Sequence, residues 1–250
     1  MSDKPTSNSR RDFVKSALIT ISTASLSTAV SAAHGQGSVP ERDQRFLNES
    51  EKEFLNSAVD RLIPPDERWP GASGAGVVNY IDLQMGGAWG RGDLLYMKGP
   101  HRQGSWTQGY QFEYTPAELF RRSILAINRV CAAQGTPFSR MTDTEKDAFL
   151  TKLDKGELDL DGVPSNIFFD QLLDQTVQGF FSDPIYGGNK DKVGWRMLGF
   201  PGAYADYFDL VDKHGIEFQR EPLSIGDGGG MTSKMPMQQT PDVDHTWKGR

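Results

Sequence analysis

The stretch TPAELFRRSILAINRVCAAQGTP, residues 115–137, carries the clearest helix signal in the chain. Thr115 and Glu118 stand three residues apart, which is the spacing of a capping box, and Pro116 occupies the first helical position. The apolar residues that follow recur at helical spacing on one face: Phe120, Ile124, Ile127 and Cys131. Gly135 and Pro137 then end the run. We therefore predict an amphipathic helix whose apolar face, including the Cys131 thiol, is turned toward a core.

Apolar residues at helical spacing also recur before and after this segment of the sequence. Further helices are predicted to begin at Asn48, near Val77 after the glycine-rich turn 71–76, and at Thr142, Ser165 and Pro201. Ser165 is expected to cap its helix, whose inward face is Phe168, Phe169, Leu172, Leu173, Val177 and Phe180. The last helix is expected to turn Tyr204, Phe208 and Val211 inward and to end before Gly215. No alternating strand and no βαβ unit emerges, so the predicted fold is all-α, a compact helical bundle with long irregular loops.

Composition narrows the class of protein. The 250 residues are 37% hydrophobic, which suffices for one globular domain with its own core. The single cysteine excludes a disulfide framework, a zinc site made of cysteines and a four-cysteine iron–sulfur site within the chain. The formal net charge of −6 argues against nucleic acid as a partner, because phosphate recognition requires a basic face.

The N-terminus has the layout of an export signal. Arg10, Arg11 and Phe13 stand in a charged front segment, an apolar stretch diluted by Ser and Thr follows, and small residues end it at Ala33. This order is typical of a twin-arginine signal. The alternatives are a membrane helix, which needs about 20 strongly apolar residues, or a chance arginine pair. We expect residues 1–33 to be the signal peptide, 34–221 a helical domain and 222–250 an extended tail rich in Gly, Pro and Met.

This signal predicts the location of the mature chain. Twin-arginine signals are typical of proteins exported already folded, as a protein must be when its cofactor is loaded in the cytoplasm. The chain is therefore expected in the periplasm, on the periplasmic face of the inner membrane. No second apolar run is long enough to span a bilayer, so contact with the membrane is expected only through partners.

A search for catalytic groups finds no strong motif. No G-x-G-x-x-G follows a strand, no Walker loop is present, and the C-x-x-C-H motif of covalently attached haem is missing. The four histidines are scattered, which disfavours a metal site. Asp183, Asn189 and Asp191, around the Gly187-Gly188 turn, could form a polar pocket, but Asp and Asn beside Gly more often make turns. We predict no catalytic, cofactor-binding or metal-binding residue in this chain.

Three segments lack a helical period, and two of them are rich in aromatic residues. Residues 86–112 contain Trp89, Tyr96, Trp106 and Tyr110, residues 181–200 contain several rings, and residues 222–250 cannot bury much of themselves. Long irregular loops with aromatic side chains are typical of interfaces. The aromatic residues of 181–200 have an alternative role, which is to close the core of the bundle itself. Cys131 is expected to be an inert buried thiol, and pairing with a cysteine of another chain is the minority hypothesis.

Two blocks of sequence resemble a known family. The first is AVDRLIPP at 58–65, followed by PGA at 70–72, AGV at 75–77 and YID at 80–82. The second is GFFSDPIYGGN at 179–189, followed by GW at 194–195 and GFPG at 199–202. Together with the export signal, these blocks resemble the gluconate 2-dehydrogenase subunit 3 family over roughly residues 45–215. That family comprises the small (gamma) subunits of membrane-bound, flavin-dependent sugar and sugar-acid dehydrogenases.

The resemblance implies a heterotrimer with a division of labour. FAD would belong to a large flavoprotein subunit of the glucose–methanol–choline (GMC) type, and haem c to a multihaem cytochrome c subunit that passes electrons to ubiquinone. The small subunit, with no cofactor of its own, would carry the folded flavoprotein through the export pore. Substrate specificity, for gluconate or another sugar, would then lie outside this chain.

The family motif supplies no established catalytic residue. We therefore predict a partner-binding surface in the second block, formed by the rings of Phe181, Tyr186, Trp195 and Phe200, with Gly187 and Gly188 making the turn that presents them. The alternative is a free-standing periplasmic carbohydrate-active enzyme or sugar-binding protein, in which the aromatic loop 86–112 forms the cleft.

Overall fold

The computed structural model describes residues 45–102, 104–105, 108–204, 208, 211–215 and 221–227. The chain divides into two units, Met1–Glu41 and Arg42–Arg250, and every described residue belongs to the second. The predicted signal, with Arg10, Arg11 and Phe13, therefore lies outside the described residues, as does the tail beyond residue 227.

The described residues form six α-helices, four short 3₁₀ turns and one two-stranded antiparallel sheet. The α-helices are α2 (Glu49–Leu62), α3 (Val77–Gly86), α4 (Pro116–Ala133), α5 (Asp143–Asp154), α6 (Ser165–Phe181) and α7 (Val193–Leu198). The strands are β1 (Asp159–Leu160) and β2 (Val163–Pro164), and the 3₁₀ turns are η2 (Phe138–Arg140), η3 (Pro184–Tyr186), η4 (Lys190–Lys192) and η6 (Ile225–Asp227). The predicted all-α class is confirmed.

Capping boxes begin three of these helices. In α2, α4 and α5 the pairs Asn48–Glu51, Thr115–Glu118 and Thr142–Glu145 bond reciprocally, as their spacing predicts. The predicted cap at Ser165 is wrong. Pro164 is the N-cap residue of α6, and the buried Ser165 hydroxyl donates to the Leu153 carbonyl at 3.1 Å, which ties the start of α6 to the end of α5.

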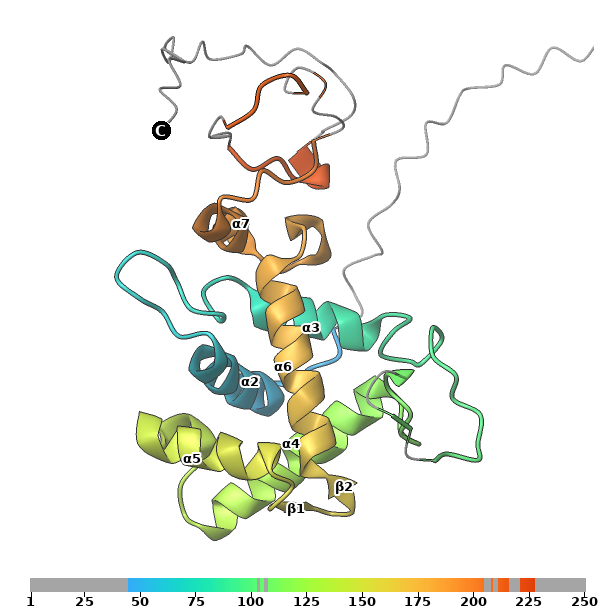
Figure 1. The fold of residues 1–250 in the computed structure, drawn as a ribbon. Coiled ribbons are helices and arrows are strands. Elements are labelled where there is room, and N and C mark those ends of the chain that lie inside the picture. The colour runs from blue at the N-terminus through green and yellow to red at the C-terminus, as the bar shows by residue number, and fades with distance from the viewer. Residues whose placement is uncertain are drawn as a thin grey trace, which may run out of the picture. The chain divides into compact units, whose positions relative to one another are not determined.

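Helix α6 is the centre of the packing. It contacts α2, α3, α4, α5 and α7, and Figure 1 shows it running across these elements. Phe168 on α6 is fully buried, with its ring centroid 5.3 Å from Phe120 and 6.4 Å from Phe54. The apolar face of α6 is narrower than the sequence predicts, because Leu173 and Val177 are exposed.

A carboxylate on α3 anchors the start of the described chain. The buried Asp82 side chain accepts from the Phe46 and Leu47 N–H groups at 2.7 and 2.8 Å. On the other side, the Arg121 guanidinium lies 3.9 Å from the Phe46 ring centroid and donates to the Phe46 carbonyl. The chain therefore enters the body through a residue pair bonded to both α3 and α4.

The helix predicted from Pro201 is wrong over the described residues. Residues 201–204 are irregular, and Gly202, with φ of 82°, forms an isolated bridge with Leu223. The Leu223 N–H donates to the Pro201 carbonyl at 3.0 Å and the Ala203 N–H donates to the Leu223 carbonyl at 2.7 Å. These backbone groups are thus bonded to a distant segment instead of to a helical turn. Phe208 and Val211, predicted to face inward, are exposed.

Candidate partner-binding site

The turn after α6 is built around two buried polar side chains. Asp183 accepts from the Ile185 N–H at 3.0 Å, and Pro184 follows it at the start of η3, which fixes the direction of the chain. Asn189, fully buried and left-handed with φ of 45°, donates to the Ser182 carbonyl and accepts from the Gly194 N–H, both at 2.8 Å. These bonds bring the start of α7 back onto the end of α6.

Three glycines allow this return. A Cβ atom on Gly188 would collide with the Gly179 carbonyl oxygen, and one on Gly194 would collide with the Phe180 carbonyl oxygen. A Cβ atom on Gly179 would lie 2.9 Å from the Tyr80 ring. The α7 backbone therefore touches the α6 backbone directly, and so does the Tyr80 side chain of α3. These contacts leave no room for a Cβ atom, which requires glycine at these positions.

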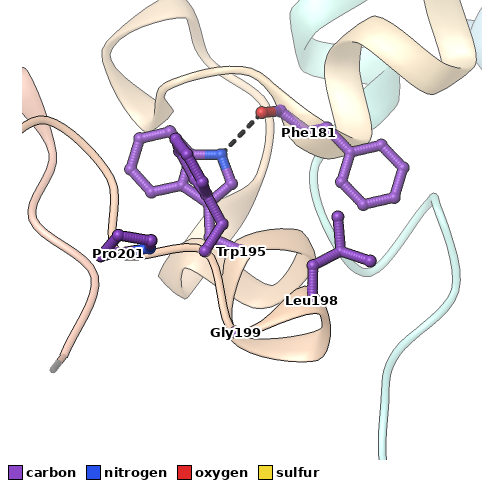
Figure 2. A pocket seen from close by; sticks show the side chains of 6 residues that line it. Phe181, Trp195, Leu198, Gly199 and Pro201 are labelled. Carbon is purple, nitrogen blue, oxygen red and sulfur yellow. Dashed lines mark hydrogen bonds between the residues drawn. The ribbon is translucent and has the colours of Figure 1, made fainter. Parts of the chain in front are cut away.

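Three of the predicted ring residues meet at an open hollow of about 480 Å³, lined by Phe181, Trp195, Leu198, Gly199, Phe200 and Pro201. The Trp195 indole N–H donates to the Phe181 carbonyl at 2.7 Å, as Figure 2 shows. The Phe200 ring packs edge-on against Trp195, with centroids 5.4 Å apart. The hollow is therefore apolar, with its rings fixed by packing and by one hydrogen bond.

The exposed fractions of the side chains that line the hollow indicate two different roles. Trp195 is only 6% exposed, so it supports the wall of the hollow instead of projecting as an anchor. Phe200 is 47% exposed and Leu198, which the sequence interpretation did not include, is 66% exposed. Leu198 gave no signal in the sequence because a six-residue helix is too short to establish a period.

The other three predicted residues lie beside the hollow and do not line it. The Gly187 carbonyl accepts from the Asn79 side chain at 2.8 Å, so the turn is fixed to α3, and Gly187 has the left-handed φ of 94°. Gly188 is buried against α6. Tyr186 and its neighbour Ile185 are exposed. The glycines thus position the turn, and Tyr186 adds a ring to the same end of the molecule.

A C-terminal segment, residues 221–227, is bound to this end; we call it the strap. Asp183 accepts from the Ser224 hydroxyl and from the Ile225 N–H, both at 2.8 Å. The sequence predicts an extended tail from residue 222, but Pro222 and Ser224 are buried. The folded body therefore extends at least to the end of η6 at Asp227.

Two ion pairs connect the strap to α7 and η4. Arg196 contacts Glu221 at 3.1 Å and Lys192 contacts Asp227 at 2.5 Å. The hydrogen bond from Lys192, together with one from the Ser224 N–H, lowers the pKa of Asp227 below its ordinary value of 3.8. Both carboxylates that neutralise these cations come from the strap.

Cys131 lies on the core face of α4, as its position in the apolar pattern predicts. It is 1% exposed, and burial raises the pKa of the thiol. It lines a hollow of about 190 Å³ together with Phe54, Phe138 and their neighbours. A disulfide with another chain is incompatible with this burial, because the sulfur would have to leave the core to meet a second cysteine.

The two ends of the loop 86–112 pack on the body, whereas Leu94 and Tyr96 between them are exposed. Trp89, Tyr110 and Phe112 are partly buried against the core, and the Tyr110 hydroxyl donates to the Tyr114 carbonyl. Burial raises the pKa of Tyr110 far above its ordinary value. Trp106 lies outside the described residues. Neither of the two hollows described above is lined by a described residue of this loop.

The glycine-rich turn 71–76 does not fit a flavin or nicotinamide phosphate. Its Ser73 N–H donates to the Asp60 carboxylate at 2.8 Å, and the Ser73 hydroxyl bonds the same side chain. The donors that a phosphate would need therefore already serve a negative charge, which would repel a second anion. In the described part of the chain, no three His, Cys, Asp or Glu side chains stand close enough to hold a metal ion. Nor, within those ranges, does any helix combine the length and apolar character needed to cross a bilayer.

Comparison with known proteins identifies the family. The family model described as gluconate 2-dehydrogenase subunit 3 matches residues 49–202, which span the helices from α2 to α7 and the apolar hollow. No curated protein and no solved structure matches the chain. Since the family model covers more than half of the sequence, this chain belongs to the gluconate 2-dehydrogenase subunit 3 family.

Proposed function

We propose that this chain is the non-catalytic small subunit that exports, stabilises and holds the flavoprotein of a gluconate 2-dehydrogenase or a related sugar dehydrogenase. Membership of the family makes the chain a subunit, which implies other subunits. In this proposal the partners are a GMC-type flavoprotein that binds FAD and a cytochrome c subunit that passes electrons to ubiquinone. The assembly works in the periplasm, on the face of the inner membrane.

The observation that carries the proposal is the apolar hollow at the end of α6 and α7. A rigid, ring-lined pocket that faces solvent is the type of surface that anchors a partner chain. Phe200 and Leu198 offer exposed apolar area there, while Trp195 holds the wall in place.

The N-terminal motif supports the export role. A twin-arginine signal serves cargo that folds before transport, yet the glycine-rich turn of this chain suits no flavin phosphate. A signal on the small subunit and a flavin in the large one fit together if the two chains travel as a folded complex.

The test is to express the flavoprotein subunit with a small subunit carrying Arg10→Lys and Arg11→Lys. Dehydrogenase activity is expected to remain in the cytoplasm, and the periplasmic fraction to lose most of it. The matched control is Arg68→Lys, an exposed arginine in the loop before α3, which is expected to leave export intact. Undiminished periplasmic activity with the twin-arginine variant would show that the small subunit does not carry its partner out.

A further inference from the structure

The strap lies outside the part of the chain that the family model matches, which ends at residue 202. The strap is nevertheless hydrogen-bonded to the end of the matched region at several points. Two groups of the strap donate to the Asp183 carboxylate, and backbone hydrogen bonds join Leu223 to Pro201 and Ala203. Because Pro201 lines the hollow, the strap is hydrogen-bonded to a residue of its wall.

The strap also changes the charge of this end of the molecule. Arg196 on α7 and Lys192 on η4 each contact a carboxylate of the strap, Glu221 and Asp227 respectively. Without the strap, these two cations would lose these partners.

Exposed apolar side chains lie on the segments that the strap joins. Leu198 and Phe200 come from the α7 segment, Ile185 and Tyr186 from η3, and Ile225 from the strap itself. The strap, which is distant in sequence, thus adds an apolar residue to this end of the molecule, where Figure 1 shows η6 lying beyond α7.

We propose that the strap completes the docking surface, so that this end binds an apolar, uncharged segment of another subunit of the assembly. This inference rests on the proposed function. The partner places one large apolar side chain in the hollow between Phe200 and Leu198. The ring walls match an apolar anchor, and the carboxylates of the strap offset two cations that would attract an acidic one.

Two expected properties distinguish this docking surface from one that binds its partner through ion pairs. First, its affinity is insensitive to salt, since salt screens interactions between exposed charges and not apolar contact. Second, the carboxylates of the strap act by neutralising Arg196 and Lys192. Removing the carboxylates alone weakens binding, and removing the cations as well restores it.

The experiment is a competition inside the intact assembly. A tagged variant and the untagged wild-type chain are co-expressed with the other subunits, and the ratio of the two small chains in the purified assembly is measured. The variant Glu221→Gln with Asp227→Asn is expected to lose about tenfold in this ratio, the equivalent of about 1.4 kcal/mol. Adding Arg196→Gln and Lys192→Gln to it is expected to return the ratio to within about twofold of the wild type, since the two unpaired cations are then removed.

The matched control is Asp161→Asn, which breaks the exposed Arg129–Asp161 ion pair at the β1–β2 turn. It is expected to compete as well as the wild type. Thermal unfolding of each isolated variant verifies that the body stays folded. Washing the purified assembly at increasing salt is expected to leave the wild-type chain bound.

The possible failures are distinct. If the first variant competes equally, or if the four-residue variant stays as weak as the first, the strap does not act by neutralising charge. Release of the wild-type chain by moderate salt would overturn the apolar character of the surface. If the wild-type chain fails to co-purify with any subunit, the proposed function itself fails.

Discussion

The body formed by α2 to α6 and the end formed by η3, α7 and the strap are stabilised in different ways. In the body, tilted and edge-on rings such as Phe54, Phe120 and Phe168 fill the interior, and capping boxes begin α2, α4 and α5. At the α7 end, Asp183 and Asn189 satisfy backbone groups of segments with no period of their own. Hydrophobic patterning therefore specifies the first region, and a few polar side chains in special conformations specify the second.

The largest expected effect comes from the body. Phe168→Ala removes a fully buried ring at the contact of α6 with α2 and α4, and is expected to destabilise the chain by about 3–5 kcal/mol. Urea unfolding followed by circular dichroism measures this loss. Tyr186→Ala, an exposed ring at the other end, is the control and should change stability by less than about 0.5 kcal/mol. Similar losses for the two variants would contradict the division between the regions.

A smaller and local effect is expected at the α7 end. Asn189→Gly keeps the left-handed backbone accessible but removes two buried hydrogen bonds, at a cost of about 2 kcal/mol. Hydrogen exchange should show faster opening of α7 while α4 and α5 stay protected. Asp191→Gly, an exposed neighbour with φ of 56°, should instead be neutral or stabilising because glycine relieves strain there. Uniform loss of protection across all helices would mean that the two regions unfold as one.

The smallest expected effect concerns pH at the strap. The Lys192 hydrogen bond lowers the pKa of Asp227 from 3.8, so the contribution of this carboxylate is present above that value and is lost as the pH falls through the lowered pKa. Near neutral pH, Asp227→Asn should speed hydrogen exchange at Ser224 and Ile225. The difference from the wild type should vanish in acid, once the pH lies below the lowered pKa of Asp227. A difference that persists unchanged there would remove Asp227 from the strap's attachment.

Periodicity and capping signals predict most of the body. Five helices begin close to their predicted residues because their apolar faces and caps are local in sequence. The exceptions have physical reasons. Ser165 bonds a carbonyl of the preceding helix and leaves the cap to Pro164, and Leu173 and Val177 are exposed because α6 is not covered on every side. At Pro201, pairing with Leu223 replaces the helix that local propensity favours.

The site is less accessible to sequence reasoning. The aromatic block is where the hollow forms, but the burial of Trp195 depends on a bond to Phe181, 14 residues earlier. The strap depends on contacts between residues about forty positions apart, such as Ser224 with Asp183, 41 residues earlier. No periodic signal marks such pairs. Only the composition of the block, rich in rings and glycines, indicated the region.

The ten-residue helix α3 connects the start of the described chain to the turn after α6. The Asp82 carboxylate accepts from the Phe46 and Leu47 N–H groups, and one turn earlier the Asn79 side chain donates to the Gly187 carbonyl. Because Arg121 on α4 also bonds Phe46, tension on the chain ahead of Arg45 would be shared between α3 and α4. Helix α3 would transmit its share to the turn beside the hollow, so a pull from the N-terminal side would bear on the helix that fixes this turn.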